Sequence, residues 1–327
     1  MKKIAILVFF TVGFFVHVWA CTGLIAGKQA TVDGSVLVTY SADSHTLYGA
    51  LTSSPAADWP KGSMRSIVEW DTNKPLGEIE QVEHTYAVIG NMNEHQLTVV
   101  ESTWGGRPEL VDTTGIIDYG SLMQLALERA KTAREAIKVM TGLVKKYGYY
   151  SSGESFTIAD PNEAWILDLI GKGPGRRGAV WVAVRIPDDC IAGHANYPRI
   201  HKIPMDDKEN CLYSPDVISF AREMGYFDGL NKDFSFARAY SPADFGALRA
   251  CDARVWSFFR KYDSSMDNYL PYVNGESAEP FPLYVKPSRK LSVQDMKEAM
   301  RDHFEDTPFD MTQDVGAGPF KVPYRFR

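Results

Sequence analysis

The sequence predicts a single α+β domain in which antiparallel sheets pack against helices. Apolar, β-branched runs occur in pairs around short polar turns, which is typical of β-hairpins. Segments with helical periodicity separate these pairs, so that the order along the chain is hairpins, helices, hairpins, helices. The 327 residues contain no internal repeat and no low-complexity linker, so nothing divides the chain into several domains.

The N-terminal residues have the layout of a secretory signal. A lysine pair precedes an apolar run over residues 4–18, which is too short to span a bilayer comfortably. Small residues stand where a signal peptidase needs them, so cleavage after Ala20 would make Cys21 the first residue of the mature protein. We therefore expect a signal peptide over residues 1–20, one domain over residues 21–327, and a periplasmic or secreted protein.

The strand candidates follow in order. Residues 21–39 give two apolar runs around a turn at Asp33-Gly34, which predicts a hairpin that begins at the mature N-terminus. Residues 45–80 are mixed and contain proline, so loops with short strands are expected. Residues 84–103 predict a second hairpin around a polar turn at residues 91–95. The later strand candidates are residues 155–171, around an Asp-Pro-Asn-Glu turn, and residues 181–187 and 190–198.

Helices are predicted in two regions. Residues 119–148 have helical periodicity, and Thr132 followed three residues later by Glu135 is typical of a capping box, so two successive helices are expected. Two later helices are predicted to begin at Ser241-Pro242 and near Ser292, each with a polar N-cap and an acid in its first turn.

Composition excludes several classes of protein. The signal segment takes two of the 35 Lys and Arg residues and none of the 41 Asp and Glu residues, so the mature chain has a formal charge of −8. No block of basic residues with interleaved aromatics occurs, so we expect no nucleic-acid partner. No later segment is long and apolar enough for a transmembrane span. We expect no cofactor, and assembly into a homo-oligomer stays open.

Three cysteines besides Cys21 leave two alternatives open. Cys190, Cys211 and Cys251 lack the short spacing of a zinc knuckle or a redox motif. Either Cys190 and Cys211 form a disulfide while Cys251 is a buried thiol, or all three are unpaired core thiols.

Cys21 itself can be interpreted in three ways: a lipid anchor, a structural thiol, or a nucleophile. The bulky Trp19 and the absence of a polar tether after Cys21 count against lipidation. An N-terminal cysteine combines a thiol of pKa about 8.5 with an α-amine of pKa about 8, so the amine can take the thiol proton. Such a site needs no catalytic histidine, and the seven histidines show neither triad nor metal-ligand spacing. The pattern therefore favours a nucleophile.

Several segments together resemble one known family. They are "CTGLIAGKQATVDGSVLVTYSADSH", "GNMNEHQLTVVESTWGGR", "GESFTIADPNEAWILDLIGKGPG" and "GHANYPRI". They are similar to the cysteine dipeptidase A family of N-terminal-nucleophile (Ntn) hydrolases, which is distantly related to penicillin V acylases and bile salt hydrolases. The resemblance covers most of residues 21–270. It implies a four-layer αββα sandwich of two antiparallel sheets between helical layers, and metal-free hydrolysis of dipeptides.

The resemblance also implies roles for individual residues. Cys21 matches the nucleophile, and its α-amine matches the base. Asp43 matches an acid that holds the N-terminal ammonium or thiol, and Asn196 matches the side-chain amide of the oxyanion hole. Arg254, on the helix predicted after Ser241, aligns with an arginine near the nucleophile. Without the resemblance, Asp43 and Asn196 would be turn residues, and Arg254 would be a surface residue of an amphipathic helix.

Two positions depart from the acylase branch. Tyr40 stands where that branch has an arginine, and it offers a hydroxyl donor instead. Thr103 stands at the second asparagine, so the oxyanion hole would rest on Asn196 and backbone amides. The charged candidates for binding the two ends of a dipeptide are Arg254, Arg107 and Glu101.

The function expected from the sequence is that of an exported cysteine dipeptidase that acts on small peptides through a Cys21 thioester. One alternative is an N-acyl amide acylase of the penicillin V or bile salt type. The other, from a different class, is a surface binding protein that is lipid-anchored through Cys21. Relatives in the family are commonly longer, so we expect this chain to be C-terminally incomplete relative to them.

Overall fold

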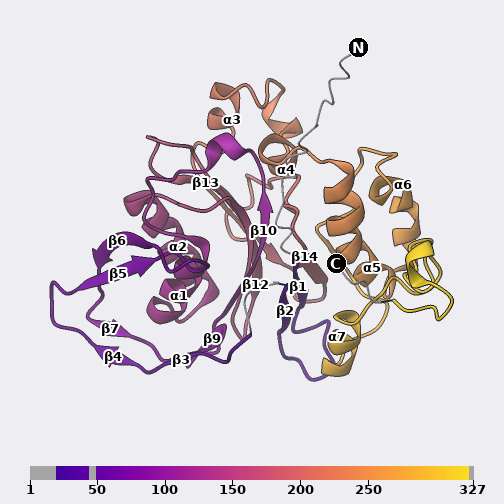
Figure 1. Ribbon diagram of the computed structural model, residues 1–327, viewed down its shortest axis with the longest axis horizontal. Helices are drawn as coiled ribbons and strands as arrows, with labels where there is room; N and C mark the ends of the chain where they lie inside the picture. Colours follow the sequence, from indigo (N-terminus) through magenta and orange to yellow (C-terminus); the bar gives the residue numbers. More distant parts are fainter. Residues whose placement is uncertain (1–19, 44–48, 324–327) are drawn as a thin grey trace, which may run out of the picture.

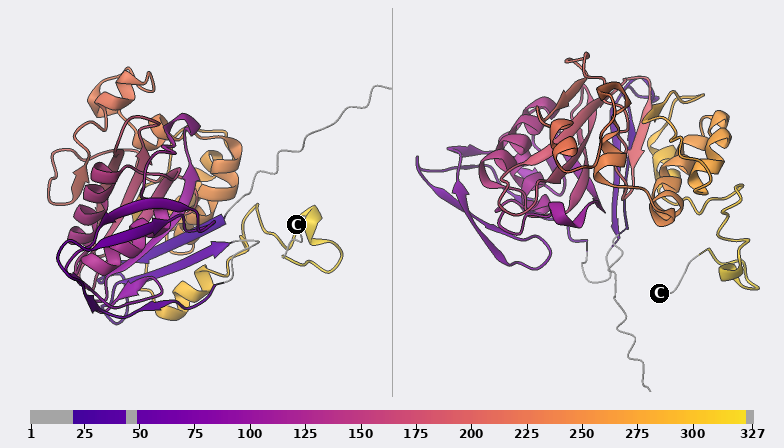
Figure 2. Two further views of the ribbon diagram at one scale, coloured as in Figure 1. Left: turned by 60° about the vertical axis from the view of Figure 1, so that its left-hand side comes forward. Right: turned by 90° about the horizontal axis from the view of Figure 1, so that it is seen from above.

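The computed structural model describes residues 20–43 and 49–323, and these form four layers (Figure 1). A helical layer covers an eight-stranded sheet, a four-stranded sheet lies next to it, and a second helical layer covers that sheet. Figure 2 shows the two helical layers on opposite sides of the sheets. The predicted αββα sandwich is therefore confirmed. Its outer helices are α1 (Tyr119–Arg129) and α2 (Ala133–Tyr147) on one side, and α5 (Ala253–Arg260), α6 (Leu270–Val273) and α7 (Val293–Ala299) on the other.

The four-stranded sheet contains the N-terminal strand. Its order is β16 (Tyr284–Val285), β14 (Ile191–His194), β1 (Ala20–Ala26) and β2 (Leu37–Asp43), and every pair is antiparallel. The hairpin predicted over residues 21–39 is thus confirmed, and its second strand continues to Asp43. In this register Cys21 pairs with Ala42, and Ala20 pairs with Asp43.

The larger sheet is a ladder of antiparallel strands within the described residues. Its order is β15 (Cys211–Tyr213), β13 (Ala179–Ile186), β12 (Ala164–Gly171), β11 (Gly153–Ala159), β10 (Thr98–Gly105), β9 (Met92–Asn93), β8 (Val88–Ile89) and β3 (Ser53–Ser54). The strands predicted over residues 155–171, 181–187 and 190–198 all form. Two small pairs lie outside this sheet: β4 (Ala57–Asp58) with β7 (His84–Thr85), and β5 (Met64–Val68) with β6 (Pro75–Glu80).

The second predicted hairpin, over residues 84–103, is wrong in detail. The first run divides into β7 and β8, the predicted turn contains β9, and the long partner of β10 is β11. The reason is Asn93, whose buried side-chain amide donates to the carbonyls of Leu127 and Ala130 at the end of α1. The same side chain accepts from two backbone amides of its own turn, so the segment is fixed to the helix, and it forms two short antiparallel pairs, β8 with β9 and β9 with β10, in place of one hairpin.

Helix boundaries follow their caps. Thr132 accepts a hydrogen bond from the Glu135 amide at the start of α2, and Ser292 and Asp295 form a capping box at the start of α7, as predicted. The helix expected at Ser241 begins three residues later. Ser241 is instead the C-cap of α4 (Phe236–Tyr240), and Asp244 caps the next helix by accepting from the Ala247 amide at 2.7 Å.

That next helix includes a π-helical stretch over Ala247–Asp252, which leads into α5. The remaining described helical segments are α3 (Ser219–Glu223) and 3₁₀ turns at Pro108–Leu110, Asn231–Asp233, Ser264–Tyr269 and Val315–Ala317. No helix in the described part of the chain combines the length and apolarity of a membrane span.

Apolar side chains form three clusters, one at each boundary between layers in the described structure. Leu24 and Ala26 of β1 face α5, whereas Ile25 faces the larger sheet, because successive strand residues point to opposite sides. The outer face of the larger sheet packs on α1 and α2, and α3 and α4 cover one end of the cluster between the sheets. All four cysteines are free thiols, so the alternative with unpaired core cysteines holds.

Candidate active site

Cys21 lies on β1, in the middle of the four-stranded sheet, between β14 and β2. It is four residues from Ile25, so its side chain points to the same side, toward the larger sheet. Only 2% of the residue is exposed. The predicted signal peptide lies almost wholly outside the described residues, which begin at Ala20.

The backbone of Cys21 is held by Asn196 and Arg254. The Cys21 nitrogen donates to Asn196 Oδ1 at 2.7 Å. Arg254, on α5, donates from Nη1 to the Cys21 carbonyl at 2.8 Å and to Thr22 Oγ1 at 2.7 Å. Its Nη2 donates to Asn196 Oδ1 at 2.8 Å and to the Ala195 carbonyl at 3.3 Å. One guanidinium therefore connects β1, the end of β14 and α5. It can do so because its N–H donors diverge in one plane.

Asn196 has a strained backbone and a fixed amide. Its φ is +52°, in the left-handed region that asparagine tolerates better than most residues. Because two donors point at Oδ1, the orientation of the amide follows from its neighbours. Its Nδ2 donates to the Thr103 carbonyl at 2.5 Å. This bond uses one of the two amide protons of Nδ2.

A buried pair of carboxyl groups lies on the thiol side of Cys21. Glu101 on β10 accepts a hydrogen bond from the Tyr40 hydroxyl at 2.5 Å and is within hydrogen-bonding reach of the Cys21 thiol. Glu154 on β11 accepts from the Thr103 hydroxyl at 2.7 Å and contacts Glu101. Burial raises the pKa of both carboxyl groups, and for Glu154 the charge of Glu101 raises the pKa further.

The thiol is strongly biased toward its protonated form. Burial is the largest cause that raises the pKa of Cys21, followed by the negative charges of Glu101, Glu154 and Asp43. An unassisted thiolate is therefore scarce in this environment. The group needs a local proton acceptor, a compensating cation, or both, before it can act as a nucleophile.

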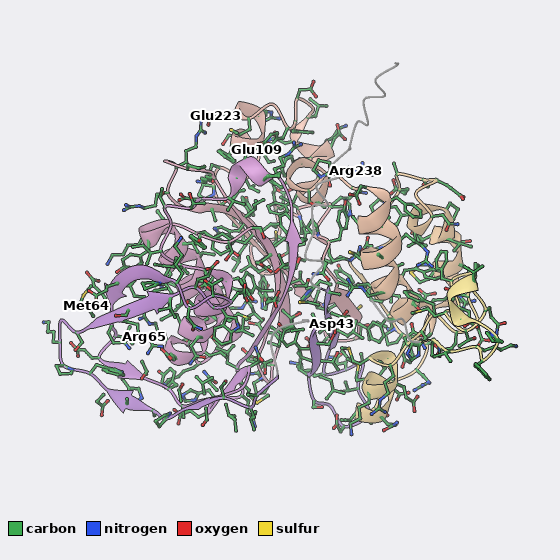
Figure 3. The ribbon with its side chains drawn as sticks, in the orientation of Figure 1. Asp43, Met64, Arg65, Glu109, Glu223 and Arg238 are labelled. Atoms are coloured by element: carbon green, nitrogen blue, oxygen red, sulfur yellow. The ribbon has the colours of Figure 1, made fainter. Side chains whose placement is uncertain are left out.

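Asp43 ends β2, on the N-terminal side of Cys21. It pairs in register with Ala20 and is exposed, and in Figure 3 it lies between the two halves of the molecule. Its charge reaches the Cys21 thiol. Arg107, by contrast, lies apart from this cluster: its Nε donates to the Ala239 carbonyl, and its guanidinium stacks on Tyr226 at 3.7 Å.

The structure thus brings together six of the eight candidate site residues, places Asp43 at their edge and holds Arg107 elsewhere. The six are Cys21, Tyr40, Glu101, Thr103, Asn196 and Arg254.

His194 is a positioning residue that sequence reasoning missed. Its ring lies between the sheets, with Nδ1 2.6 Å from Ser102 Oγ and Nε2 2.8 Å from Thr157 Oγ1. Burial lowers the pKa of His194 to about 3, so the ring is neutral. It pairs with Gly23, where a Cβ atom would stand 2.7 Å from Nε2. Only glycine fits there, so His194 fixes the Cys21 strand against the strands that carry Glu101 and Glu154.

Two further buried groups hold the Asn196 loop and the start of α5. Asp168 accepts from the Ile200 amide at 2.8 Å and from Ser155 Oγ at 2.5 Å, and burial raises its pKa to about 6. Arg199 pairs with Asp252 at 2.9 Å, and both side chains are fully buried. No sequence pattern marks these partners, because they are distant in the chain and meet only in the folded protein.

The site consists of a thiol, amide and guanidinium donors, and carboxyl groups. Among residues 20–43 and 49–323, no group of three or more His, Cys, Asp or Glu side chains is arranged to hold a metal ion. A nitrogen and a thiol on one residue, with an amide beside them, can perform acyl transfer to sulfur. A separate cavity of about 1050 Å³ is lined by residues that include His201, Phe234 and Phe281, and Cys21 is not among them.

Comparison with known proteins identifies related sequences. The profile of the family described as Peptidase family C69 matches residues 20–327. A "Probable dipeptidase" of Salmonella dublin is 28% identical over 318 residues, which cover 89% of this chain and 68% of that protein. A "Probable dipeptidase" of Latilactobacillus sakei is 25% identical, with 89% and 62% covered. "Dipeptidase A" of Lactobacillus helveticus is 25% identical, with 93% and 66% covered. The chain thus spans about two thirds of the length of these relatives.

Proposed function

The chain belongs to peptidase family C69, and from this premise we propose that it hydrolyses dipeptides through a thioester on Cys21. The names of its relatives support the substrate class. The observation that carries the mechanism is the position of Cys21. Its nitrogen is held by Asn196 and its carbonyl by Arg254, while its thiol faces the larger sheet. Nucleophile and prospective base are therefore fixed on one residue.

The proposed mechanism begins with processing. Cleavage after Ala20 turns the Cys21 nitrogen into an α-amine, which the bond to Asn196 Oδ1 holds in place. The exposed carboxylate of Asp43, across the strand pair from Ala20, would then lie beside this amine and stabilise its ammonium form. We propose export by the N-terminal signal, with a periplasmic or secreted location.

Catalysis then takes two steps. The α-amine accepts the thiol proton, sulfur attacks the peptide carbonyl carbon, and the resulting ammonium protonates the amine that leaves as the C–N bond breaks. Water next attacks the thioester while the α-amine accepts its proton, which releases the acid and restores the thiol. The second Nδ2 proton of Asn196 would stabilise the oxyanion in both steps.

The test uses protein that begins at Cys21. We expect it to release amino acids from unblocked dipeptides, and Cys21→Ala to lower that turnover by at least about 10³-fold, because no other group replaces the nucleophile. Cys211→Ala is the matched control, since Cys211 is also a buried strand cysteine but lies on β15. Its turnover should remain near that of the wild type.

The outcomes separate the alternatives. Mass spectrometry of the quenched reaction should show an acyl group on the peptide that contains Cys21. Undiminished turnover by Cys21→Ala would exclude the nucleophile. Hydrolysis of N-acyl amides in place of dipeptides would assign the chain to acylase chemistry instead.

A further inference from the structure

We propose that the buried Glu101–Glu154 pair binds the α-ammonium group of the substrate, so that the enzyme requires a free amino group on the residue whose carbonyl is attacked. This inference rests on the proposed function, since it assigns the part of a dipeptide that the site recognises. It adds Glu154, which was not among the site residues predicted from the sequence, to Glu101.

The first argument is distance. In a dipeptide the α-nitrogen is separated from the scissile carbonyl carbon by one Cα atom, about 2.5 Å away. A group that binds this nitrogen must therefore be adjacent to the nucleophile. Glu101 meets this condition, because its carboxyl group is within hydrogen-bonding reach of the Cys21 thiol. Arg107, whose guanidinium stacks on Tyr226, does not.

The second argument is that few donors surround the four oxygens of the two carboxyl groups. Tyr40 donates to Oε1 of Glu101, and Thr103 donates to Oε1 of Glu154. The Oε2 atoms of both glutamates are buried, and no backbone amide, hydroxyl or cationic side chain of the described residues donates to them. Glu101 is 2% exposed and Glu154 is fully buried. Because the two carboxyl groups are hydrogen-bonded to each other, and Glu101 also to the Cys21 thiol, the pair shares a proton whose place an ammonium donor can take.

The third argument is charge. Within the described residues neither glutamate forms an ion pair, and burial raises the pKa of both carboxyl groups, which favours the neutral acids while no cation is bound. The other acids nearby, Asp71 and Asp43, add negative charge, and Asp71 accepts from the Tyr119 hydroxyl. The buried Glu128 differs, because Arg65 lies 3.3 Å from it. An ammonium group supplies both the donors and the cation that this cluster lacks.

The same contact would couple binding to chemistry. The carboxyl groups raise the pKa of the Cys21 thiol, so they suppress the thiolate while the site is empty. A bound ammonium group neutralises that field at the moment when the scissile carbonyl arrives. The thiolate therefore forms when a substrate with a free ammonium group is bound. A peptide with a blocked amino group does not lower the pKa of the thiol in this way.

The experiment measures binding separately from turnover. L-alanyl-L-alanine and its N-acetyl derivative are titrated calorimetrically into Cys21→Ala protein that begins at residue 21. We expect the free dipeptide to bind at least 30-fold more tightly than the acetylated one. When Glu101→Gln is added to Cys21→Ala, the affinity for the free dipeptide should fall at least 10-fold. The affinity for the acetylated dipeptide should change less than 3-fold. Glu128→Gln is the matched control, because it alters an equally buried glutamate on α1 and should leave both affinities unchanged.

Two outcomes would overturn the ammonium site: equal affinity for the two peptides, or an equal loss of both on Glu101→Gln. Circular dichroism checks that each variant is folded, and Glu154→Gln gives an independent test if Glu101→Gln is not. The two proposals fail differently. Selective binding by Cys21→Ala without dipeptide hydrolysis by the wild type would support the ammonium site and reject the dipeptidase. Hydrolysis of dipeptides by the wild type, without selective binding by Cys21→Ala, would support the dipeptidase and reject the ammonium site.

Discussion

At the scale of single residues, Arg254 shows how much of the site depends on one planar group. Its two terminal nitrogens reach four acceptors, on the backbone of Cys21 and Ala195 and on the side chains of Thr22 and Asn196. A guanidinium can do this because its donors diverge in a fixed plane, whereas an ammonium group is a compact point charge. The arrangement fixes the Cys21 backbone and the Asn196 amide relative to each other.

We therefore predict that Arg254→Lys, although it preserves charge, lowers kcat/KM for dipeptides by about 10²-fold, because the Asn196 amide and the Cys21 nitrogen lose their common support. Steady-state kinetics would measure this loss. Arg260→Lys on the same helix is the control, since Arg260 pairs only with the exposed Asp267 in its described contacts, and its kcat/KM should stay near that of the wild type. Equal effects of the two replacements would contradict the role of Arg254.

Individual site residues were predictable where they stood in a distinctive motif. Cys21 and Asn196 lie in such segments, and the resemblance placed Arg254 near the nucleophile. Glu154 and His194 also lie in the quoted segments but were assigned no role, because each is a polar residue in an apolar strand and its partners lie on other strands. Arg107 was proposed for its charge alone, and its stacking on Tyr226 could not be read from the sequence.

At the scale of elements, the contact between β1 and β14 sets the position of the thiol. Gly23 leaves space for the His194 ring, which bonds to β10 and β11 in the other sheet. The absence of a side chain at residue 23 is thus what allows one ring to connect three strands. Cys21 is two residues away on the same strand.

We predict that Gly23→Ala destabilises the protein by about 1–3 kcal/mol, since the new methyl group displaces the His194 ring, and that it lowers dipeptide turnover as well. Urea unfolding gives the change in the free energy of unfolding. The matched control is Gly142→Ala on α2, where a Cβ atom meets open space; it should stabilise the helix by about 1 kcal/mol. A Gly23→Ala protein as stable as the wild type would show that the ring is not fixed.

Elements with strong local signals were predicted correctly, and those governed by distant contacts were not. The Thr132 and Ser292 caps located α2 and α7 because a capping side chain acts within its own turn. The segment around Asn93 looked like a hairpin tip, but the end of α1 binds its amide. Ser241 looked like an N-cap, but it is the C-cap of α4. The N-cap of the following helix is Asp244, which accepts from the Ala247 amide.

At the scale of the whole molecule, processing should change chemistry and leave the architecture intact. The bond between the Cys21 nitrogen and Asn196 is present with Ala20 attached, and three apolar clusters hold the layers together independently of it. The fold class followed from the order of hairpins and helices, since the layers depend on this order more than on any single residue. The contacts of His194 with Ser102 and Thr157, which connect the two sheets, could not be predicted from that order.

We predict that a protein with Gly-Ala before Cys21 unfolds at the same urea concentration as one that begins at Cys21, yet turns over dipeptides about 10²–10⁴-fold more slowly, because its nitrogen is an amide and cannot act as a base. Parallel denaturation and kinetic assays on the two proteins would measure this difference. Full activity of the extended protein would mean that the base is a different group.

The strand order of the smaller sheet also bears on the time at which the site forms. β1 comes at residues 20–26, but one of its neighbours, β14, comes at residues 191–194, and β16 at residues 284–285 closes the sheet edge. Contacts so distant in the chain form slowly, because long loops must close first. The helical hairpin of α1 and α2, whose contacts are local, has no such delay. The thiol is therefore synthesised before both β14 and β16, and its surroundings are complete only when these strands have joined the N-terminal hairpin.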